Sequence, residues 1–402
     1  MEEKLRTFAQ VEDPVDERTA VELMPSTERF PLPPLQDVLP IVEKYFSDLN
    51  SLTPIFSRAN FMRMLYQWYS PSACHDPASW AAINVVLALS LQNCATNKVD
   101  HNEVGKHVDN AQSVLTSLLA HEQDLKGIQV LLGLATLFLS MPTPLFASIL
   151  IATAVKLVHR LQLHTKSANK YLSADLALER ENVFWITYIL DKEINMCTHE
   201  PYLLQEKDID VEIPDYFNAH DMAGALTTPT WFNLLESRVH LARLQGSAYD
   251  WAYTAQAERL SHIERLANSQ KLYHMLHCWK HSIPDILQPE SFTNSVPTFA
   301  IRHFLLLYFT YFRIVYVAHR VFSHDAEWIV RLVNYSQINV VEFYQGHGKG
   351  TSESVLPADW PEILEVSRTC MRLFRIVDQS DLALTMYVWS EPPSRTYAQL
   401  TF

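Results

Sequence analysis

The sequence predicts an all-α fold, a large multi-helix bundle with a single extended core and little or no strand. Glycine scarcity supports this most directly: only 8 of 402 residues are glycine, and tight hairpins and phosphate-binding loops rely on that residue. Apolar residues also recur at intervals of three and four, as they do on the buried face of a helix. Finally, 48% of residues are hydrophobic and 19% charged, a balance typical of a chain with a sizeable core rather than a disordered one.

The first helices are expected after a lead-in. Residues 1–33 carry four prolines and mixed charges, which indicates a mobile, acidic segment. Residues 34–49 place apolar side chains at helical spacing. Ser57 is the expected N-cap of the next helix, and Asp76 followed by Pro77 marks the start of a third.

The helical pattern continues to about residue 377. Ser173 is expected to cap a long helix that runs through Trp185 to about Cys197. The segment 346–354 holds three of the eight glycines and is the expected flexible surface loop. We therefore predict one helical domain over 34–380 and a C-terminal tail over 381–402. The other expected helices lie at about 101–120, 124–140, 144–163, 229–254, 256–281, 296–322, 325–343 and 360–377.

One apolar run is long enough to raise the question of whether the chain crosses a membrane. Residues 127–155 contain no charged residue. However, Pro142 and Pro144 divide the run into two pieces, each shorter than the ~20 residues that a spanning helix needs. Two core helices joined by a proline-rich corner fit better, so we expect a soluble protein with no membrane partner.

Charge and cysteine usage exclude several functions. The net charge is −13 and no run of three Lys or Arg occurs, whereas DNA binding needs a basic face. The five cysteines are widely scattered, which indicates free thiols rather than a disulfide framework. Because no Cys-x-x-Cys pair is present, these residues cannot form a cysteine-based zinc cluster. The acidic N-terminus is not a signal peptide.

Several residues between 160 and 214 form an ordered series of motifs. A helix ends in Arg160-Leu-Gln-Leu-His164, a second helix carries a basic residue, two aromatics, a tyrosine and an aspartate, and a proline-containing loop leads to an acidic segment closed by a second proline. After His164, the residues concerned are Arg180, Phe184, Trp185, Tyr188, Asp191, Pro201, Asp208, Asp210 and Pro214.

This series resembles the middle regulatory region of fungal binuclear zinc-cluster transcription factors. Trp279, within a leucine–tryptophan–proline segment, and the pair His319 and Arg320 at a helix end extend the resemblance over about 35–380. Gln162 stands where the family usually has glycine, and of the family's glycine–arginine–proline turn only Pro201 is kept. These departures indicate a divergent member.

The resemblance implies a nuclear, or otherwise cytoplasmic, regulator of transcription that is not an enzyme. It would act through protein partners, as a homodimer, or through a conformational change driven by a small-molecule effector, with a metabolic or secondary-metabolite pathway as its target. Zinc is expected only in the DNA-binding module, which these residues lack, so we expect no cofactor and no direct nucleic-acid binding. The chain is then a co-regulator, a decoy dimer or a truncated product. The alternative is an enzyme or small-molecule-binding protein that reuses the helical scaffold.

Several groups of residues are candidate sites. His274, Cys278 and His281 share a helix face and are weak metal candidates, although packing at an interhelix surface explains them better. The aromatic residues Phe184, Trp185 and Tyr188 fit the core better than a pocket lining. We expect Asp191 to pair with Arg160 or His164, since a carboxylate on an apolar face needs a partner.

The acidic run from Glu206 to Asp215 could bind a cation or a basic partner, but a solvated loop edge is its ordinary role. Known catalytic motifs are missing from the sequence: there is no G-x-S-x-G, P-loop, G-x-G-x-x-G or H-E-x-x-H. The sequence therefore predicts no catalytic residue, although distant helices could still bring histidines and carboxylates together.

Overall fold

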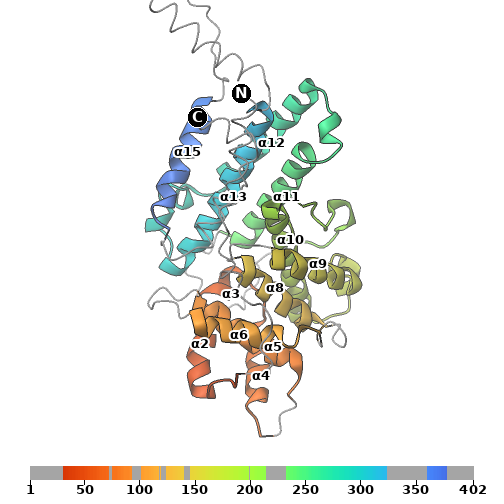
Figure 1. Cartoon of the computed structure of the whole chain (residues 1–402), viewed down its shortest axis with the longest axis vertical. Coiled ribbons are helices and arrows are strands. Elements are labelled where there is room, and N and C mark those ends of the chain that lie inside the picture. The colour runs from red at the N-terminus through yellow and green to blue at the C-terminus, as the bar shows by residue number, and fades with distance from the viewer. Residues whose placement is uncertain are drawn as a thin grey trace, which may run out of the picture.

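A computed structural model describes residues 30–71, 75–92, 101–116, 118, 124–139, 145–198, 200–213, 232–323 and 360–377. Every regular element in these ranges is an α-helix or a short 3₁₀-helix, so the all-α prediction is confirmed (Figure 1). The expected helix at 325–343, the loop at 346–354 and the tail at 381–402 lie outside the described residues, as does nearly all of the lead-in.

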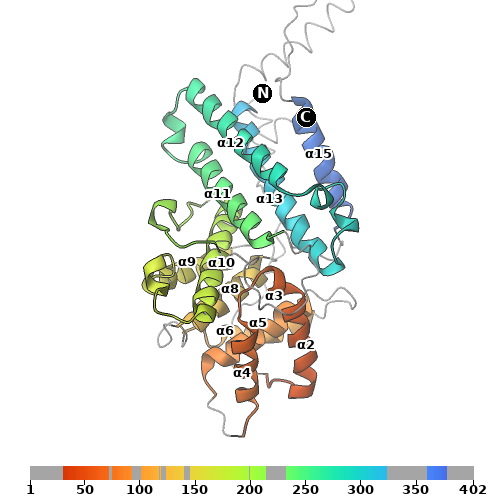
Figure 2. The ribbon, with the colours of Figure 1, turned by 180° about the vertical axis from the view of Figure 1, so that it is seen from behind.

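The N-terminal helices form one end of an elongated molecule (Figures 1 and 2). Ser57 caps α4 by accepting a hydrogen bond from the N–H of Asn60, and Asp76 accepts from the N–H of Ser79 at 2.6 Å at the start of α5. Both predicted caps are therefore confirmed. The helices are α2 (Leu35–Ser47), α3 (Leu49–Leu52), α4 (Arg58–Trp68), α5 (Pro77–Gln92) and α6 (His101–Gln112).

The middle of the molecule holds α8 (Leu125–Leu139), α9 (Leu145–Arg160) and α10 (Ala174–Thr198). The apolar run at 127–155 thus falls on two separate helices that pack together, as expected. Helices α5 and α8 are buried on nearly all sides, which explains why their sequences are apolar all round. Ser173 lies just before α10 and accepts a hydrogen bond from the N–H of Leu176.

The other end of the molecule consists of α11 (Leu234–Ala252), α12 (His262–Ser282), α13 (Thr298–Ser323) and α15 (Trp360–Phe374). The predicted start near 256 for α12 is wrong. A 3₁₀-helix occupies Ala257–Arg259, and a capping box between Ser261 and Glu264 then starts the α-helix. The box satisfies two N–H groups that would otherwise lack a partner, which fixes the start.

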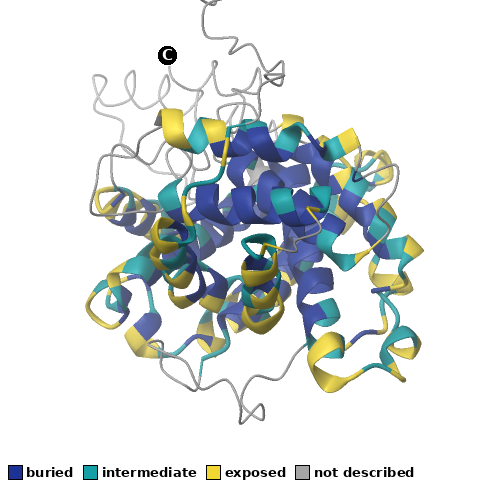
Figure 3. Ribbon diagram, turned by 90° about the horizontal axis from the view of Figure 1, so that it is seen from below, coloured by how far each residue is buried: buried dark blue, intermediate teal, exposed yellow. Residues whose placement is uncertain are grey.

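Buried apolar side chains group into two clusters, whereas the sequence predicted one extended core. The first cluster is built mainly from α2 to α10 and the second mainly from α11 to α15. Helix α11 serves both, because Val239 and Ala242 belong to the first cluster and Leu241 and Leu244 to the second. Figure 3 shows the buried residues gathered inside a shell of exposed ones.

One stretch of α13, Thr298–His319, is long and apolar enough to cross a membrane by length and composition alone. Of its most apolar window, 78% is buried inside the protein. A core helix of a folded domain passes the same test, because its whole circumference is covered by other helices. Helix α13 is thus weak evidence for a membrane span, and it forms the centre of the second cluster.

Candidate functional site

The end of α9 has the geometry of a Schellman motif. The N–H of Leu163 donates to the carbonyl of Val158 at 3.0 Å, and that of Gln162 donates to His159 at 3.1 Å. Gln162 has a φ of 53°, the left-handed conformation that glycine adopts most easily. The family glycine that Gln162 replaces therefore has a conformational role.

Arg180 on α10 binds the same helix end. Its guanidinium donates to the carbonyl of Leu161 and to Asn169, each at 2.8 Å. The first of these bonds satisfies a carbonyl that the helix itself leaves without a donor. Arg180 therefore links α9, the following 3₁₀-helix (Lys166–Asn169) and α10.

Asp191, fully buried on α10, holds the loop that follows that helix. Its carboxylate accepts from the backbone N–H groups of Leu203 and Leu204 at 3.0 and 2.9 Å, and from Asn195 at 2.7 Å. Lys192 lies 3.5 Å from the same carboxylate and donates to the carbonyl of Leu204. Burial raises the pKa of Asp191, and these donors oppose that effect because they stabilise the ionised form.

Lys192 also lies over two aromatic rings. Its Nζ is 3.4 Å from the ring centroid of Tyr202 and 4.7 Å from that of Tyr188, which favours a cation. Burial lowers the pKa of Lys192 to about 8, with Asp191 acting in the opposite direction. Lys192 is therefore a protonated, enclosed ammonium at neutral pH.

Tyr188 and a second aromatic residue of α10, Trp185, hold the rest of the loop. The hydroxyl of Tyr188 donates to Glu206, which also pairs with Arg243 of α11 at 3.5 Å. The indole N–H of Trp185 donates to the carbonyl of Glu212 at 2.8 Å. We call the five α10 residues that hold α9 and the loop the α10 clamp: Arg180, Trp185, Tyr188, Asp191 and Lys192.

The predicted pairing of Asp191 with Arg160 or His164 is wrong. Arg160 is exposed and His164 takes no part in the contacts of Asp191. The carboxylate is instead surrounded by Lys192, Asn195 and the N–H groups of the returning loop. The aromatic residues Phe184, Trp185 and Tyr188 are fully buried, in keeping with a core role. Four of the motif residues thus belong to the α10 clamp: Arg180, Trp185, Tyr188 and Asp191.

The remaining motif residues are scattered. Asp210 accepts from the N–H of Lys166 at 2.6 Å, while Pro201 and Asp208 are exposed. Buried Trp279 donates to the carbonyl of Ser237 at 3.0 Å, and His319 is buried beside Tyr273. Pro214 and the side chain of Arg320 lie outside what the structure describes.

The metal candidates lie on α12. His274, Cys278 and His281 are all exposed, so the expected packing at an interhelix surface is wrong. His274 Nε2 and Cys278 Sγ are 3.7 Å apart, but Nδ1 of His281 is bonded to the carbonyl of His277 instead. Within the described ranges, no three His, Cys, Asp or Glu side chains converge as metal ligands do.

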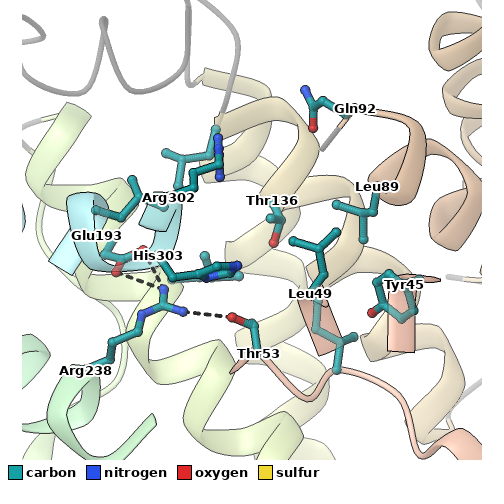
Figure 4. Close-up of a pocket in the computed structure, with 14 residues that line it drawn as sticks. Tyr45, Leu49, Thr53, Leu89, Gln92, Thr136, Glu193, Arg238, Arg302 and His303 are labelled. Carbon is teal, nitrogen blue, oxygen red and sulfur yellow. Dashed lines mark hydrogen bonds and ion pairs between the residues drawn. The ribbon is translucent and has the colours of Figure 1, made fainter. Parts of the chain in front are cut away.

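A pocket opens between the two core clusters (Figure 4). Its cavity volume is about 80 Å³. Part of its lining is apolar. Five leucines contribute to it: Leu49, Leu89, Leu139, Leu190 and Leu306.

The polar part of the pocket lining carries charge. Arg238 of α11 donates to both carboxylate oxygens of Glu193 at 3.1 and 3.3 Å, and to the hydroxyl of Thr53 at 3.1 Å. Arg302 of α13 also lines the pocket. The Glu193–Arg238 pair joins α10 to α11, and its side chains are largely buried.

His303 of α13 reaches into the pocket (Figure 4). His303 is only 7% exposed, and its Nε2 is buried with no hydrogen-bond partner in the described part of the chain. Burial, with Arg238 and Arg302 nearby, lowers the pKa of His303 to about 3. The imidazole is therefore neutral at physiological pH, with one N–H and one acceptor nitrogen.

Sequence reasoning missed this pocket entirely. Its charged residues and its histidine come from three separate helices, α10, α11 and α13, and no short motif joins them. The available signal was the presence of Glu193, Arg238 and His303 on otherwise apolar helices, since buried polar groups need partners. Which residues would meet could not be read from the chain.

Comparison with known proteins adds independent findings. A family profile described as the fungal specific transcription factor domain matches residues 42–281. The chain is 31% identical over 313 residues to the ABC-transporter-regulating transcription factor of Aspergillus oryzae, covering 76% of this chain and 35% of that protein. No solved structure matches.

Two further relatives are more distant. The Fusaridione A cluster transcription factor of Fusarium heterosporum is 26% identical over 314 residues, covering 74% of this chain and 56% of that protein. An uncharacterized transcriptional regulatory protein of Schizosaccharomyces pombe is 23% identical over 287 residues, covering 69% and 37%. The chain thus spans between about a third and just over half the length of these relatives, which are named as regulators of transcription rather than as enzymes.

Proposed function

This chain belongs to the family of proteins that carry the fungal specific transcription factor domain, and from that premise we propose that it is a transcriptional regulator without catalytic activity. The family match, which covers more than half of the chain, is the observation that carries this proposal. The names of the relatives support it, because they describe factors that control transcription. A nuclear location follows from the same proposal.

The proposed mechanism is conformational. The helical body would hold a DNA-reading module silent or active, and an effector or protein partner would shift the balance between the two states. Two features support this. The α10 clamp fixes the middle of the molecule, and the two core clusters meet at a pocket.

DNA contact would come from a module that these 402 residues do not supply, whether on a longer form of the chain, on a second copy or on another protein. The net charge of −13 supports this, because DNA phosphates repel an acidic surface. Structural zinc would be confined to that module. One relative is named for a metabolite gene cluster and another for transporter regulation, so we propose genes of secondary metabolism or transport as targets.

A tethering experiment tests the proposal. The chain is fused to an unrelated DNA-binding module, and reporter transcription is compared with that of the module alone. We expect the fusion to raise or lower transcription reproducibly. The variant Asp191→Ala, which opens the α10 clamp, should lose the effect, whereas Glu43→Gln, at an exposed ion pair, should keep it.

A fusion that accumulates in the nucleus and leaves the reporter at the level of the module alone would contradict a regulatory role. The genomic DNA upstream of the first codon gives a second test. Six closely spaced cysteine codons in frame would show that the zinc-cluster module belongs to the same polypeptide. Without them, a partner protein would have to supply the contact with DNA.

A further inference from the structure

The outer face of α12 carries four side chains that can bind a transition metal. The inner face of the helix is fixed by packing, because Leu272, Leu276 and Trp279 are buried. In a helix, side chains at positions i and i+4 lie on one face, one above the other. The outer face presents two such pairs. These exposed residues are His274 with Cys278, and His277 with His281.

The spacing within the first pair matches that of two ligands on one zinc ion. Nε2 of His274 lies 3.7 Å from Sγ of Cys278. In a tetrahedral site with Zn–N of about 2.0–2.1 Å and Zn–S of about 2.3 Å, the nitrogen and sulfur atoms are about 3.6 Å apart. A zinc ion can therefore bind both atoms with little movement of either side chain.

The second pair offers no negative charge. Nδ1 of His281 lies 2.8 Å from the carbonyl of His277. A carbonyl oxygen only accepts, so Nδ1 of His281 is the donor and Nε2 is the one nitrogen left to bind a metal. Two neutral imidazoles leave the charge of a divalent ion uncompensated, whereas a thiolate neutralises part of it. Thiolate and imidazole are also the ligands that zinc prefers. The first pair is therefore the better zinc site.

We propose that His274 and Cys278 bind a zinc ion on the outer face of α12, with water molecules as the remaining ligands. Binding breaks the S–H bond of Cys278: the sulfur keeps the electron pair and bonds to zinc, and the proton passes to the solvent. Two protein ligands leave the site open, so the ion exchanges with the solution. Structural zinc sites, by contrast, have four protein ligands. This site is thus distinct from the zinc cluster of the proposed DNA-reading module.

Cobalt(II) is the probe, because its complexes absorb visible and near-ultraviolet light whereas those of zinc do not. The purified full chain, kept reduced with a phosphine, is titrated with cobalt(II) chloride. We expect the charge-transfer band of a cobalt–thiolate bond, which reaches its limit at one equivalent. Zinc chloride added afterwards should abolish the band by displacing cobalt.

Three variants locate the site. Cys278→Ser should abolish the band. His274→Asn should weaken cobalt binding at least tenfold, since loss of a mere supporting contact to a ligand already costs about 10–100-fold in metal affinity. His281→Asn removes an equally exposed histidine three residues from Cys278. It is the matched control and should keep both the band and the affinity.

These substitutions are at exposed positions, so they should leave folding intact. Urea unfolding of each variant without metal should match that of the parent, because surface changes away from special features alter stability by less than about 0.5 kcal/mol. A loss of cobalt binding in a variant that unfolds as the parent does is then a loss of ligand.

A parent protein without the thiolate band would overturn the proposal, and cobalt binding by histidines alone would appear in this way. A band that Cys278→Ser leaves intact would also overturn it, because another cysteine would then be the ligand. Equal losses in His274→Asn and His281→Asn would contradict the pairing of His274 with Cys278. None of these outcomes bears on the regulatory role, which the tethered reporter measures without added metal.

Discussion

Gln162 shows how a single residue departs from its family at a measurable cost. Its φ of 53° is unfavourable for a residue with a Cβ, by about 1 kcal/mol or more. Glycine adopts this conformation without strain but loses more freedom on folding. The resemblance marks glycine at this position, and the Schellman geometry of α9 supplies the reason.

We expect Gln162→Gly to stabilise the protein by about 0.5–1 kcal/mol, since the relief of strain exceeds the added entropy cost. The midpoint of urea unfolding would rise with an unchanged slope. Gln162→Ala keeps the Cβ and should give no gain. A glycine variant no more stable than the alanine variant would show that the left-handed position carries no strain.

Asp191 is the second residue whose removal has a defined cost. Asp191→Ala would leave Lys192 buried without its carboxylate and two loop N–H groups without an acceptor. Breaking a buried pair in this way costs about 3–5 kcal/mol, and urea unfolding measures it. Asp191→Asn, which keeps one acceptor oxygen, should fall between the parent and the alanine variant.

The matched control is the exposed pair of Arg58 and Glu43, whose side chains are 60% and 46% exposed. Glu43→Gln should cost less than about 1 kcal/mol, because water and salt screen surface pairs. Equal losses in Asp191→Ala and Glu43→Gln would mean that the α10 clamp contributes no more than a surface contact.

At the scale of helices, two glycines differ in whether the packing of neighbouring helices requires glycine. A Cβ on Gly133 of α8 would lie 2.2 Å from Cγ1 of Val85 on α5, whereas one on Gly105 of α6 would meet nothing within 4 Å. Gly133 therefore permits the close approach of α5 and α8. Gly105 has no packing reason to be glycine.

We expect Gly133→Ala to destabilise the protein by about 1–2 kcal/mol, because overpacking costs more than the helix propensity of alanine returns. Gly105→Ala should stabilise it by up to about 1 kcal/mol. Thermal unfolding of both variants shows directly whether each substitution lowers or raises the stability. A stable Gly133→Ala variant would mean that α5 and α8 can separate freely.

The helices were largely predictable because their signals are local. Ser57, Asp76 and Ser173 each satisfy N–H groups a few residues away, and the sequence displays that spacing. The capping box at Ser261 was equally local but was overlooked. Contacts between helices were not predictable: the partner of Asp191 is decided by how the loop returns to α10, and His303 meets Arg238 only through the packing of α11 against α13.

At the scale of the molecule, the net charge bears on whether this helical body contacts DNA. The described helices form an elongated body with two apolar clusters (Figures 1 and 2), while the whole chain carries a net charge of −13. Non-specific DNA affinity depends on basic groups that displace counterions from the phosphates. The acidic net charge therefore opposes non-specific contact with DNA phosphates.

We expect the purified chain to show no saturable binding to DNA at about 50–200 mM salt, because a protein without a basic face gains nothing from counterion release. Fluorescence anisotropy of labelled duplexes at both salt concentrations measures this. The same chain fused to an unrelated DNA-binding module is the positive control and should bind only duplexes that contain the site of that module. Saturable binding by the unfused chain that weakens steeply as salt rises would reveal a basic surface that the net charge conceals, and DNA contact would then have to be assigned to this body itself.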